Sequence, residues 1–482
     1  MRNNKLVSIY LSCPLIACFT FEKVTEPWLV DSTWQQNANS IHLQSLKQST
    51  INEKEVLSLT LEEAVEMAIK RNPQIQVAQQ QLLEAEEGLK ATSRSYFPTL
   101  SLSSYLQISD QLISDPKTGV SIDIIGNDEF NTTLSGSIEL NYNVYTGGLR
   151  TGQLQIAKAQ LESATLEIEI TTLEVELAVI QAYYQLQAAE QDLKIASQAV
   201  VNSETTLRDT QALAQARMVT QPDVAQAELN LANYRQHLNQ ALNNRLVALS
   251  QLTQVLNLPA NLEIQASSSV EKAGKWDLSL EESISLAWQQ RPELKQQLTQ
   301  VETAKANRQV SLAQIRPNIS LNSEMTASRL YISESFNGST LNQTGIEIDT
   351  SITAQITWEF FDGGIARAQA RQAEAQMNAA SRQLDVIRSQ IQQEVEEAFT
   401  QLQYNQKNVE LASSVLDLAM QTLKSRRIQF QAGVIDINTL ISAEIALNQA
   451  EENFNNAIIG YNLALASIRN ATNTRLTPID NK

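Results

Sequence analysis

Few residues in this sequence are of the types that carry out enzymatic chemistry. The 482-residue chain has only two histidines, His42 and His237, and two cysteines, Cys13 and Cys18. It contains no HExxH, no CxxC, no phosphate-binding loop and no GxGxxG ahead of a helix, which are common motifs for metal and nucleotide binding. We therefore predict that the protein is not an enzyme and that it uses no cofactor.

Acidic and glycine residues at expected turns are the remaining candidates for a functional site. Asp223 and Asp436 lie in two expected chain reversals, where a lone aspartate is commonly a local backbone cap. The pairs Gly147–Gly148 and Gly363–Gly364 are expected at strand-to-helix junctions, where close approach or positive φ is needed.

The first residues have the features of an export signal. A basic start precedes an apolar run from Leu6 to Phe21, which is shorter than the about 20 residues of a membrane-spanning helix. We predict a signal segment at 1–21 and a polar linker at 22–56. Residues Leu15–Cys18 also resemble a bacterial lipoprotein cleavage box, in which Cys18 would become the acylated N-terminus. Cleavage without acylation is the alternative.

The composition favours long helices over stacked globular layers. Glycine, proline and aromatic residues are few, whereas alanine, leucine, glutamine and glutamate are frequent. The formal net charge is -17, and the basic residues do not cluster along the chain. We exclude nucleic acid as a partner, because binding it requires grouped lysines and arginines at the phosphates.

The chain contains an internal repeat. Arg71–Pro73 matches Gln290–Pro292 at an offset of 219 residues, and Tyr142–Gly148 matches Trp358–Gly364 at an offset of 216 residues. Each repeat is expected to hold a short helix, a medium helix, two strands and two long antiparallel helices. The predicted organisation is a first structural repeat at 57–260, a linker at 261–275, a second repeat at 276–472 and a C-terminal tail at 473–482.

Four segments alternate apolar and polar residues with a period of two, which indicates strands with two different faces. They span about 99–108, 134–145, 318–328 and 346–361. One alternative is a sheet with one face on a soluble core. The segments are, however, long enough to cross a bilayer when tilted, and aromatic residues gather at one end of them. Four strands cannot close a membrane barrel, so three chains with twelve strands are the simplest closure.

Two long regions are free of helix breakers. The region 149–218 has only Gly152 and no proline, and the region 365–432 has neither residue type. Helices of this length reach about 100 Å, several times the thickness of a membrane. Apolar residues recur every seven positions from Leu154 to Ala196, which predicts coiled-coil packing. Heptads alone would also fit an ordinary structural coiled coil.

The order and spacing of these motifs resemble the outer membrane efflux protein family, the TolC-type outer membrane factors. The resemblance covers about Leu57 to Thr472 and is carried by Phe360–Gly364, Gln372–Glu374, Gln431–Val434 and Ser442–Glu444. It implies a mainly α fold with a membrane β-barrel, in which a homotrimer closes twelve strands in outer-membrane lipid. An α-helical tunnel of long coiled-coil hairpins would extend into the periplasm of a Gram-negative-type bacterium.

The same resemblance implies a function. Family members passively conduct drugs, small molecules or secreted proteins, and they dock with a periplasmic membrane fusion (adaptor) protein and an inner-membrane pump. This arrangement is a tripartite efflux or type I secretion system. Some members close the periplasmic tip with aspartate rings, whose positions fall on Thr439 and Ser442 in this sequence. The sequence departs from that pattern, and Asp223 and Asp436 are the nearest substitutes. A ring of aspartates at a narrow mouth would concentrate cations, but each aspartate could instead serve as a local backbone cap, and the sequence leaves both roles open.

A non-conducting periplasmic coiled-coil adaptor or scaffold protein is the main alternative function. Such a protein would be soluble, with one helical hairpin and a compact sheet core. This sequence predicts two hairpins and four evenly divided amphipathic strands. An enzyme acting on envelope polymers is a more distant alternative, and it would require a buried pair of carboxylates that the sequence does not reveal.

Overall fold

The computed structural model describes residues 56–110, 130–259, 262–268, 270–336 and 339–474. Residues Val56–Lys482 belong to one unit of the chain. The predicted signal segment with its candidate lipidation site Cys18 lies outside the described residues. The same holds for the polar linker as far as Glu55 and for the C-terminal tail from residue 475 onward.

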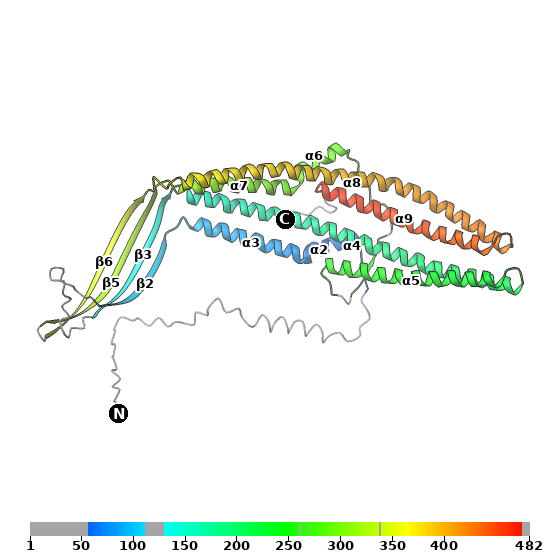
Figure 1. Cartoon of the computed structure of the whole chain (residues 1–482), viewed down its shortest axis with the longest axis horizontal. Helices are drawn as coiled ribbons and strands as arrows, with labels where there is room; N and C mark the ends of the chain where they lie inside the picture. Colours follow the sequence, from blue (N-terminus) through cyan, green and yellow to red (C-terminus); the bar gives the residue numbers. More distant parts are fainter. Residues whose placement is uncertain (1–55, 111–129, 260–261, 269, 337–338, 475–482) are drawn as a thin grey trace, which may run out of the picture. The chain divides into compact units, whose positions relative to one another are not determined.

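The same series of elements occurs twice along the chain (Figure 1). The first series comprises α2 (Leu61–Arg71), α3 (Pro73–Arg94), β2 (Thr99–Asp110), β3 (Phe130–Thr146), α4 (Leu149–Gln215) and α5 (Gln221–Val255). The second comprises α6 (Leu280–Gln290), α7 (Pro292–Ala313), β5 (Asn318–Phe336), β6 (Ser339–Thr357), α8 (Ile365–Gln431) and α9 (Ile437–Ala471). The prediction of a mainly helical chain with two repeats is confirmed.

The short helices begin at the capping boxes that the sequence contains. Thr60 is the N-cap of α2, and its backbone N–H donates to the Glu63 carboxylate at 2.8 Å. Ser279 and Glu282 make the same contact at α6, also at 2.8 Å. These bonds satisfy backbone donors that have no partner within the first turn. A proline then starts α3 and α7, where its missing N–H costs no hydrogen bond.

A small parallel sheet joins the starts of the two repeats. It pairs β1 (Val56–Leu59) with β4 (Glu263–Ala266), which lies in the region 261–275 that we expected to be a linker. The buried Tyr183 of α4 donates its hydroxyl to the Leu59 carbonyl at 3.0 Å. Each strand has only four residues, which is too few for an alternating pattern to indicate a strand, so we did not predict this pair.

The remaining four strands form one antiparallel sheet in the order β2-β3-β5-β6. The register keeps apolar residues on one face and polar residues on the other. One face carries the row Leu102, Ile138 and Met325, and the other carries the row Ser101, Glu139 and Glu324. Strands β2 and β6 each have one neighbour in this sheet, so both of its edges are open.

The strand boundaries differ from the predicted ones mainly at the end of β6 and at the hairpin between β5 and β6, and β3 begins four residues earlier than predicted, at Phe130. Strand β6 ends at Thr357, so Trp358, Phe360 and Phe361 lie beyond it and not within it. There the Trp358 Nε1–H donates to the carbonyl of Ile315 at 3.1 Å, a contact outside the β5–β6 ladder. At the opposite end β5 and β6 are longer than predicted, because their backbone pairing continues to the hairpin at Phe336 and Ser339.

The long helices run from the sheet to the two hairpin turns (Figure 1). Helix α4 packs against α3 and α7 in the half nearer the strands, and against α5 and α9 in the half nearer the turns. Helix α8 packs against α7 and α9. The predicted heptad stripe of α4 is buried only in its later part, at Val175, Ala182, Ala189 and Ala196. Small side chains there allow close helix approach.

Candidate functional site at the hairpin turns and strand-to-helix junctions

The two hairpin turns have the same backbone design. Helix α4 is followed by Arg217 with φ 61°, and α8 is followed by Gly433 with φ 70°. In both turns the backbone N–H groups of this residue and of the next one donate to carbonyls of the last helical turn, which is a Schellman motif. The turns also touch, since a Cβ added to Gly433 would lie 3.4 Å from the Met218 methyl carbon.

Asp223 caps the start of α5. Its carboxylate accepts from the backbone N–H and from the hydroxyl of Thr220, both at 2.7 Å. These bonds lower the pKa of Asp223, whereas the nearby Asp436 carboxylate acts in the opposite direction. Asp223 is therefore ionised at neutral pH, and the charges of the two turns lie close enough to interact.

Asp436 caps the start of α9. Its carboxylate accepts from the backbone N–H of Thr439 at 2.8 Å, and hydrogen bonds from Thr439 lower the pKa of Asp436. The Ser442 hydroxyl donates to the Asn438 carbonyl at 2.7 Å and is exposed. Of the four tip residues, Asp436 thus lies in the hairpin turn, Asp223 and Thr439 lie in the first turns of α5 and α9, and Ser442 lies in the second turn of α9. Both aspartates cap helices and still carry exposed negative charge.

The first strand-to-helix junction is enclosed by other parts of the chain. Gly147 and Gly148 have φ values of 65° and 101°. A Cβ on Gly147 would lie 2.8 Å from the Ala313 carbonyl oxygen and from the Arg316 Cβ. The Arg316 guanidinium also donates to the Gly147 carbonyl at 3.0 Å. Glycine is required here both by the backbone conformation and by the approach of α7.

Arg150 fixes the same junction from the first turn of α4. Its guanidinium donates to the carbonyls of Ser95 and Val144, each at 3.2 Å, and lies 4.5 Å from the centre of the Tyr96 ring. The side chain is buried, with 8% of the residue exposed. Arg150 therefore ties together the end of α3, the end of β3 and the start of α4.

At the second junction an acidic side chain binds the backbone, whereas basic side chains do so at the first. Gly363 and Gly364 have φ values of 68° and 91°, but a Cβ on either would meet no atom of the chain within 4 Å. Here the Asp362 carboxylate accepts from the backbone N–H groups of Gly364 at 2.8 Å and Ala366 at 2.6 Å. These bonds lower the pKa of Asp362. An aspartate at the start of α8 caps the helix and interacts favourably with its dipole.

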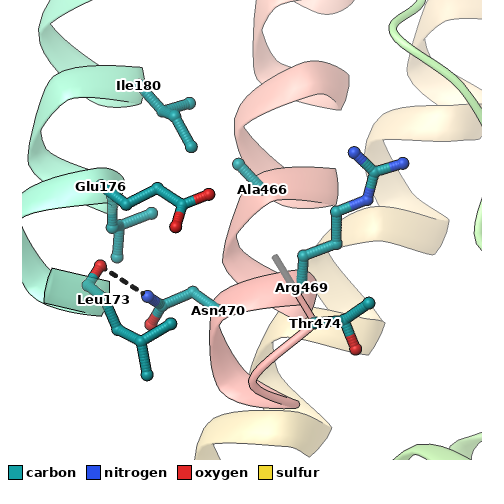
Figure 2. Close-up of a pocket in the computed structure, with 8 residues that line it drawn as sticks. Leu173, Glu176, Ile180, Ala466, Arg469, Asn470 and Thr474 are labelled. Carbon is teal, nitrogen blue, oxygen red and sulfur yellow. Dashed lines mark hydrogen bonds between the residues drawn. The ribbon is translucent and has the colours of Figure 1, made fainter. Parts of the chain in front are cut away.

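A buried polar seam joins the two repeats along α4 and α9. Near the turns, the Thr206 hydroxyl donates to the Glu444 carboxylate at 2.7 Å, and Arg427 lies 3.4 Å from the same oxygen. Burial raises the pKa of Glu444, and the bonds from Thr206 and Arg427 oppose this shift. Farther along, Asn470 donates to the Leu173 carbonyl at 3.0 Å (Figure 2). We did not predict this seam, although Ala227-Glu228 and Ala443-Glu444 recur at the repeat offset.

No metal centre is evident in the part of the chain that the structure describes, where no three His, Cys, Asp or Glu side chains are grouped to hold an ion. His237 lies beside Glu452, with 3.8 Å between Nε2 and a carboxylate oxygen. Among the helices within the described ranges, none combines the length and the apolar character that a membrane span would need.

The chain belongs to the outer membrane efflux protein family. The family model described by that name matches residues 64–258 and 283–474, which together make up most of the sequence. The two matched segments correspond to the two series of elements described above. As a member of this family, the protein is an efflux channel of the outer membrane that extends into the periplasm.

Several solved structures share the fold of this chain. The outer membrane channel CmeC of Campylobacter jejuni has a TM-score of 0.73 and 18% identity, over 86% of this chain and 85% of that chain. The MtrE outer membrane channel of Neisseria gonorrhoeae has a TM-score of 0.70 and 17% identity, over 88% and 93%. The outer membrane protein VceC of Vibrio cholerae has a TM-score of 0.70 and 16% identity, over 86% and 95%. A search of curated proteins gives no match.

Proposed function

We propose that three copies of this chain form a channel-tunnel that passively conducts exported substrates through the outer membrane and across the periplasm. The twelve strands of the trimer close a barrel in outer-membrane lipid, and the long helices form a continuous tunnel below it. The observation that carries this proposal is the two-faced sheet with two open edges, joined directly to helices about 100 Å long.

The sheet is suited to lipid on one face and water on the other. Apolar side chains such as Leu102 and Ile348 are exposed in the single chain, and the opposite face carries Glu139 and Glu324 as direct partners. Two like charges side by side need water, so the polar face is the lumen. Open strand edges in lipid would leave backbone groups without hydrogen bonds, so β6 of one copy pairs with β2 of the next.

Aromatic side chains support the position of the membrane boundary. Phe97, Trp358, Phe360 and Phe361 are exposed where the strands meet the helices. Trp358 and Phe360 pack edge to face with 6.2 Å between ring centres. Aromatic girdles of this kind lie at the headgroup level of membrane barrels. The helices then lie on the periplasmic side of that level.

The hairpin turns form the periplasmic end of the tunnel in this proposal. Three copies would place Asp223 and Asp436 around one mouth, with Thr439 and Ser442 in the first two turns of α9. Hydrogen bonds lower the pKa values of both aspartates, so the mouth carries fixed negative charge at neutral pH. Such a ring concentrates cations and raises the barrier to anions.

A passive duct needs partners that supply energy and substrate. We propose a periplasmic adaptor protein and an inner-membrane pump, assembled as a tripartite efflux or type I secretion system, with drugs, small molecules or secreted proteins as cargo. Family membership supports these roles. It likewise supports the prediction that the protein is not an enzyme.

The test is to extract the full-length protein from an outer-membrane fraction, measure the mass of the detergent particle and record conductance in planar lipid bilayers. The proposal predicts extraction only with detergent, a particle of three chains and discrete, cation-selective conductance steps. A freely soluble monomer without conductance would favour a non-conducting periplasmic adaptor or scaffold. Asp223→Asn with Asp436→Asn should lower cation selectivity without changing the number of chains.

A further inference from the structure

Within one chain, the two repeats contact each other where α9 packs along α4. Helix α9 lies along α4, and Figure 2 shows Glu176 and Leu173 of α4 facing Ala466 and Asn470 of α9. Nearer the turns, Thr206 donates to the buried Glu444 carboxylate. These contacts use one face of the first hairpin and one face of the second.

The repeat puts the same residue types on the other two faces of the hairpins. Helix α8 repeats α4, and α9 repeats α5, both at an offset of 216 residues. Thr422 of α8 is therefore the equivalent of Thr206, and Glu228 of α5 is the equivalent of Glu444. Both Thr422 and Glu228 are exposed in the chain, whereas Thr206 and Glu444 are buried.

Two hollows at equivalent positions of the repeats also differ in the exposure of their apolar side chains. One lies between α4 and α5, includes Ile195 and Ala199, and is bordered by residues of α9. The other lies between α8 and α9 and includes the equivalent residues Leu411 and Val415. Ile195 and Ala199 are 9% and 3% exposed, whereas Leu411 and Val415 are 67% and 53% exposed. Large apolar side chains exposed together on a helix face indicate an interface.

We propose that a second copy of this chain packs its α5 along α8, in the way that α9 packs along α4 within the chain, so that Thr422 donates to Glu228 of the second copy. This inference rests on the proposed trimer and adds the face and the register of its helical interface. Leu229 and Ala232 of the second copy then cover Leu411 and Val415, because they are the equivalents of the α9 residues that border the first hollow.

Charge on α8 fits this pairing. A buried carboxylate needs a cation or several hydrogen bonds to offset its lost hydration. Within the chain Arg427 has this role for Glu444. Within the first hairpin, the residue equivalent to Arg427 is Gln211, which carries no charge and cannot have this role for Glu228. Arg426 supplies the cation instead, because it lies one turn beyond Thr422 at the position equivalent to the buried Thr210.

A cross-link between differently tagged copies tests the register. One copy carries Thr422→Cys and the other carries Glu228→Cys, and the full-length trimer is treated with a short thiol-to-thiol cross-linker. The expected result is a covalent dimer that contains both tags. The matched control replaces Glu228→Cys with Leu246→Cys, about 27 Å farther along α5, and should give no such dimer. A dimer that forms only with Leu246→Cys would overturn the proposal.

A second measurement does not depend on introduced cysteines. Glu228→Gln and Thr422→Val should each lower the temperature at which the detergent-solubilised trimer dissociates, without loss of helix content. Glu410→Gln, on a part of α8 that faces Val270 and Lys272, should leave that temperature unchanged. An unchanged dissociation temperature in both test variants would overturn the pairing. If trimer and conductance persist in that case, the channel function stands and only this interface fails; without any trimer, both fail.

Discussion

The two strand-to-helix junctions occupy equivalent positions in the repeat, yet opposite chemistry stabilises them. At the first, the cationic side chains of Arg150 and Arg316 donate to backbone carbonyls. At the second, the Asp362 carboxylate accepts from backbone N–H groups of α8. Arg150 is replaced by the small, buried Ala366 at the equivalent position.

This difference follows from where each junction lies within one chain. Gly147–Gly148 is in contact with the end of α7, so its carbonyls are shielded from water and require donors from the protein. Gly363–Gly364 has no chain atom within 4 Å of an added Cβ, so a cap on the helix itself is sufficient. The same sequence plan therefore has one junction inside the chain and one at its boundary.

The largest expected effect is that of adding a methyl group to the enclosed junction. Gly147→Ala combines positive φ with a Cβ that would lie 2.8 Å from the Ala313 carbonyl, and we expect a loss of about 2 to 4 kcal/mol in the free energy of unfolding. Gly363→Ala has only the backbone strain and should cost about 1 to 2 kcal/mol. Urea unfolding followed by circular dichroism in detergent measures both. Equal losses would remove the distinction between the junctions.

Removal of the buried arginine should come next. Arg150→Met keeps much of the side-chain volume but leaves the carbonyls of Ser95 and Val144 without their donor, which should cost about 2 kcal/mol. Arg367→Met, at an exposed position in the first turn of α8, is the control and should change stability by less than about 0.5 kcal/mol. The same urea titration compares the two. A loss in the control as large as that in Arg150→Met would contradict this account.

The two hairpin turns allow a smaller test in the stabilising direction. Arg217 has the left-handed conformation that Gly433 has in the second turn. Arg217→Gly should therefore stabilise the first turn by about 0.5 to 1 kcal/mol, and Gly433→Ala should destabilise the second by about 1 kcal/mol. Thermal unfolding of the two variants side by side checks the signs. A destabilising Arg217→Gly would show that the arginine side chain has contacts that outweigh its backbone strain.

The smallest effect is expected from Asp362→Asn, because asparagine also accepts at a helix start but offers one oxygen where aspartate uses two. The pKa of Asp362 is lowered in the folded chain, so its stabilising effect is present above the ordinary aspartate pKa and is lost as the pH falls through the lowered value. In urea titrations followed by circular dichroism, the variant should unfold at a lower urea concentration than the wild type at pH 7. In strong acid the two proteins should unfold at the same urea concentration. A difference that persists in strong acid would argue against a charge-dependent cap.

The sequence was sufficient for features that local rules determine. Thr60 with Glu63 predicted a helix start, and the period-two segments predicted strands at four places where the structure has β2, β3, β5 and β6. It was not sufficient where a side chain acts on a distant backbone. Arg150 and Glu444 resemble ordinary helix charges in sequence, because nothing local shows that another element buries them. The strands β1 and β4 are too short to show a period.

Closure of the strands by other copies is the central claim, and one disulfide tests it most directly. The register of β3 with β5, shifted by the repeat offsets, places Thr353 of β6 opposite Gln107 of β2 in a second copy. Within one chain these strands form opposite edges of the sheet.

Thr353→Cys with Gln107→Cys should therefore give covalently linked trimers on a non-reducing denaturing gel. The protein without introduced cysteines should give none. Thr353→Cys with Ser103→Cys, about 13 Å out of register, should also give none. Monomers in all three proteins, or trimers only in the shifted pair, would contradict the closure that the account predicts.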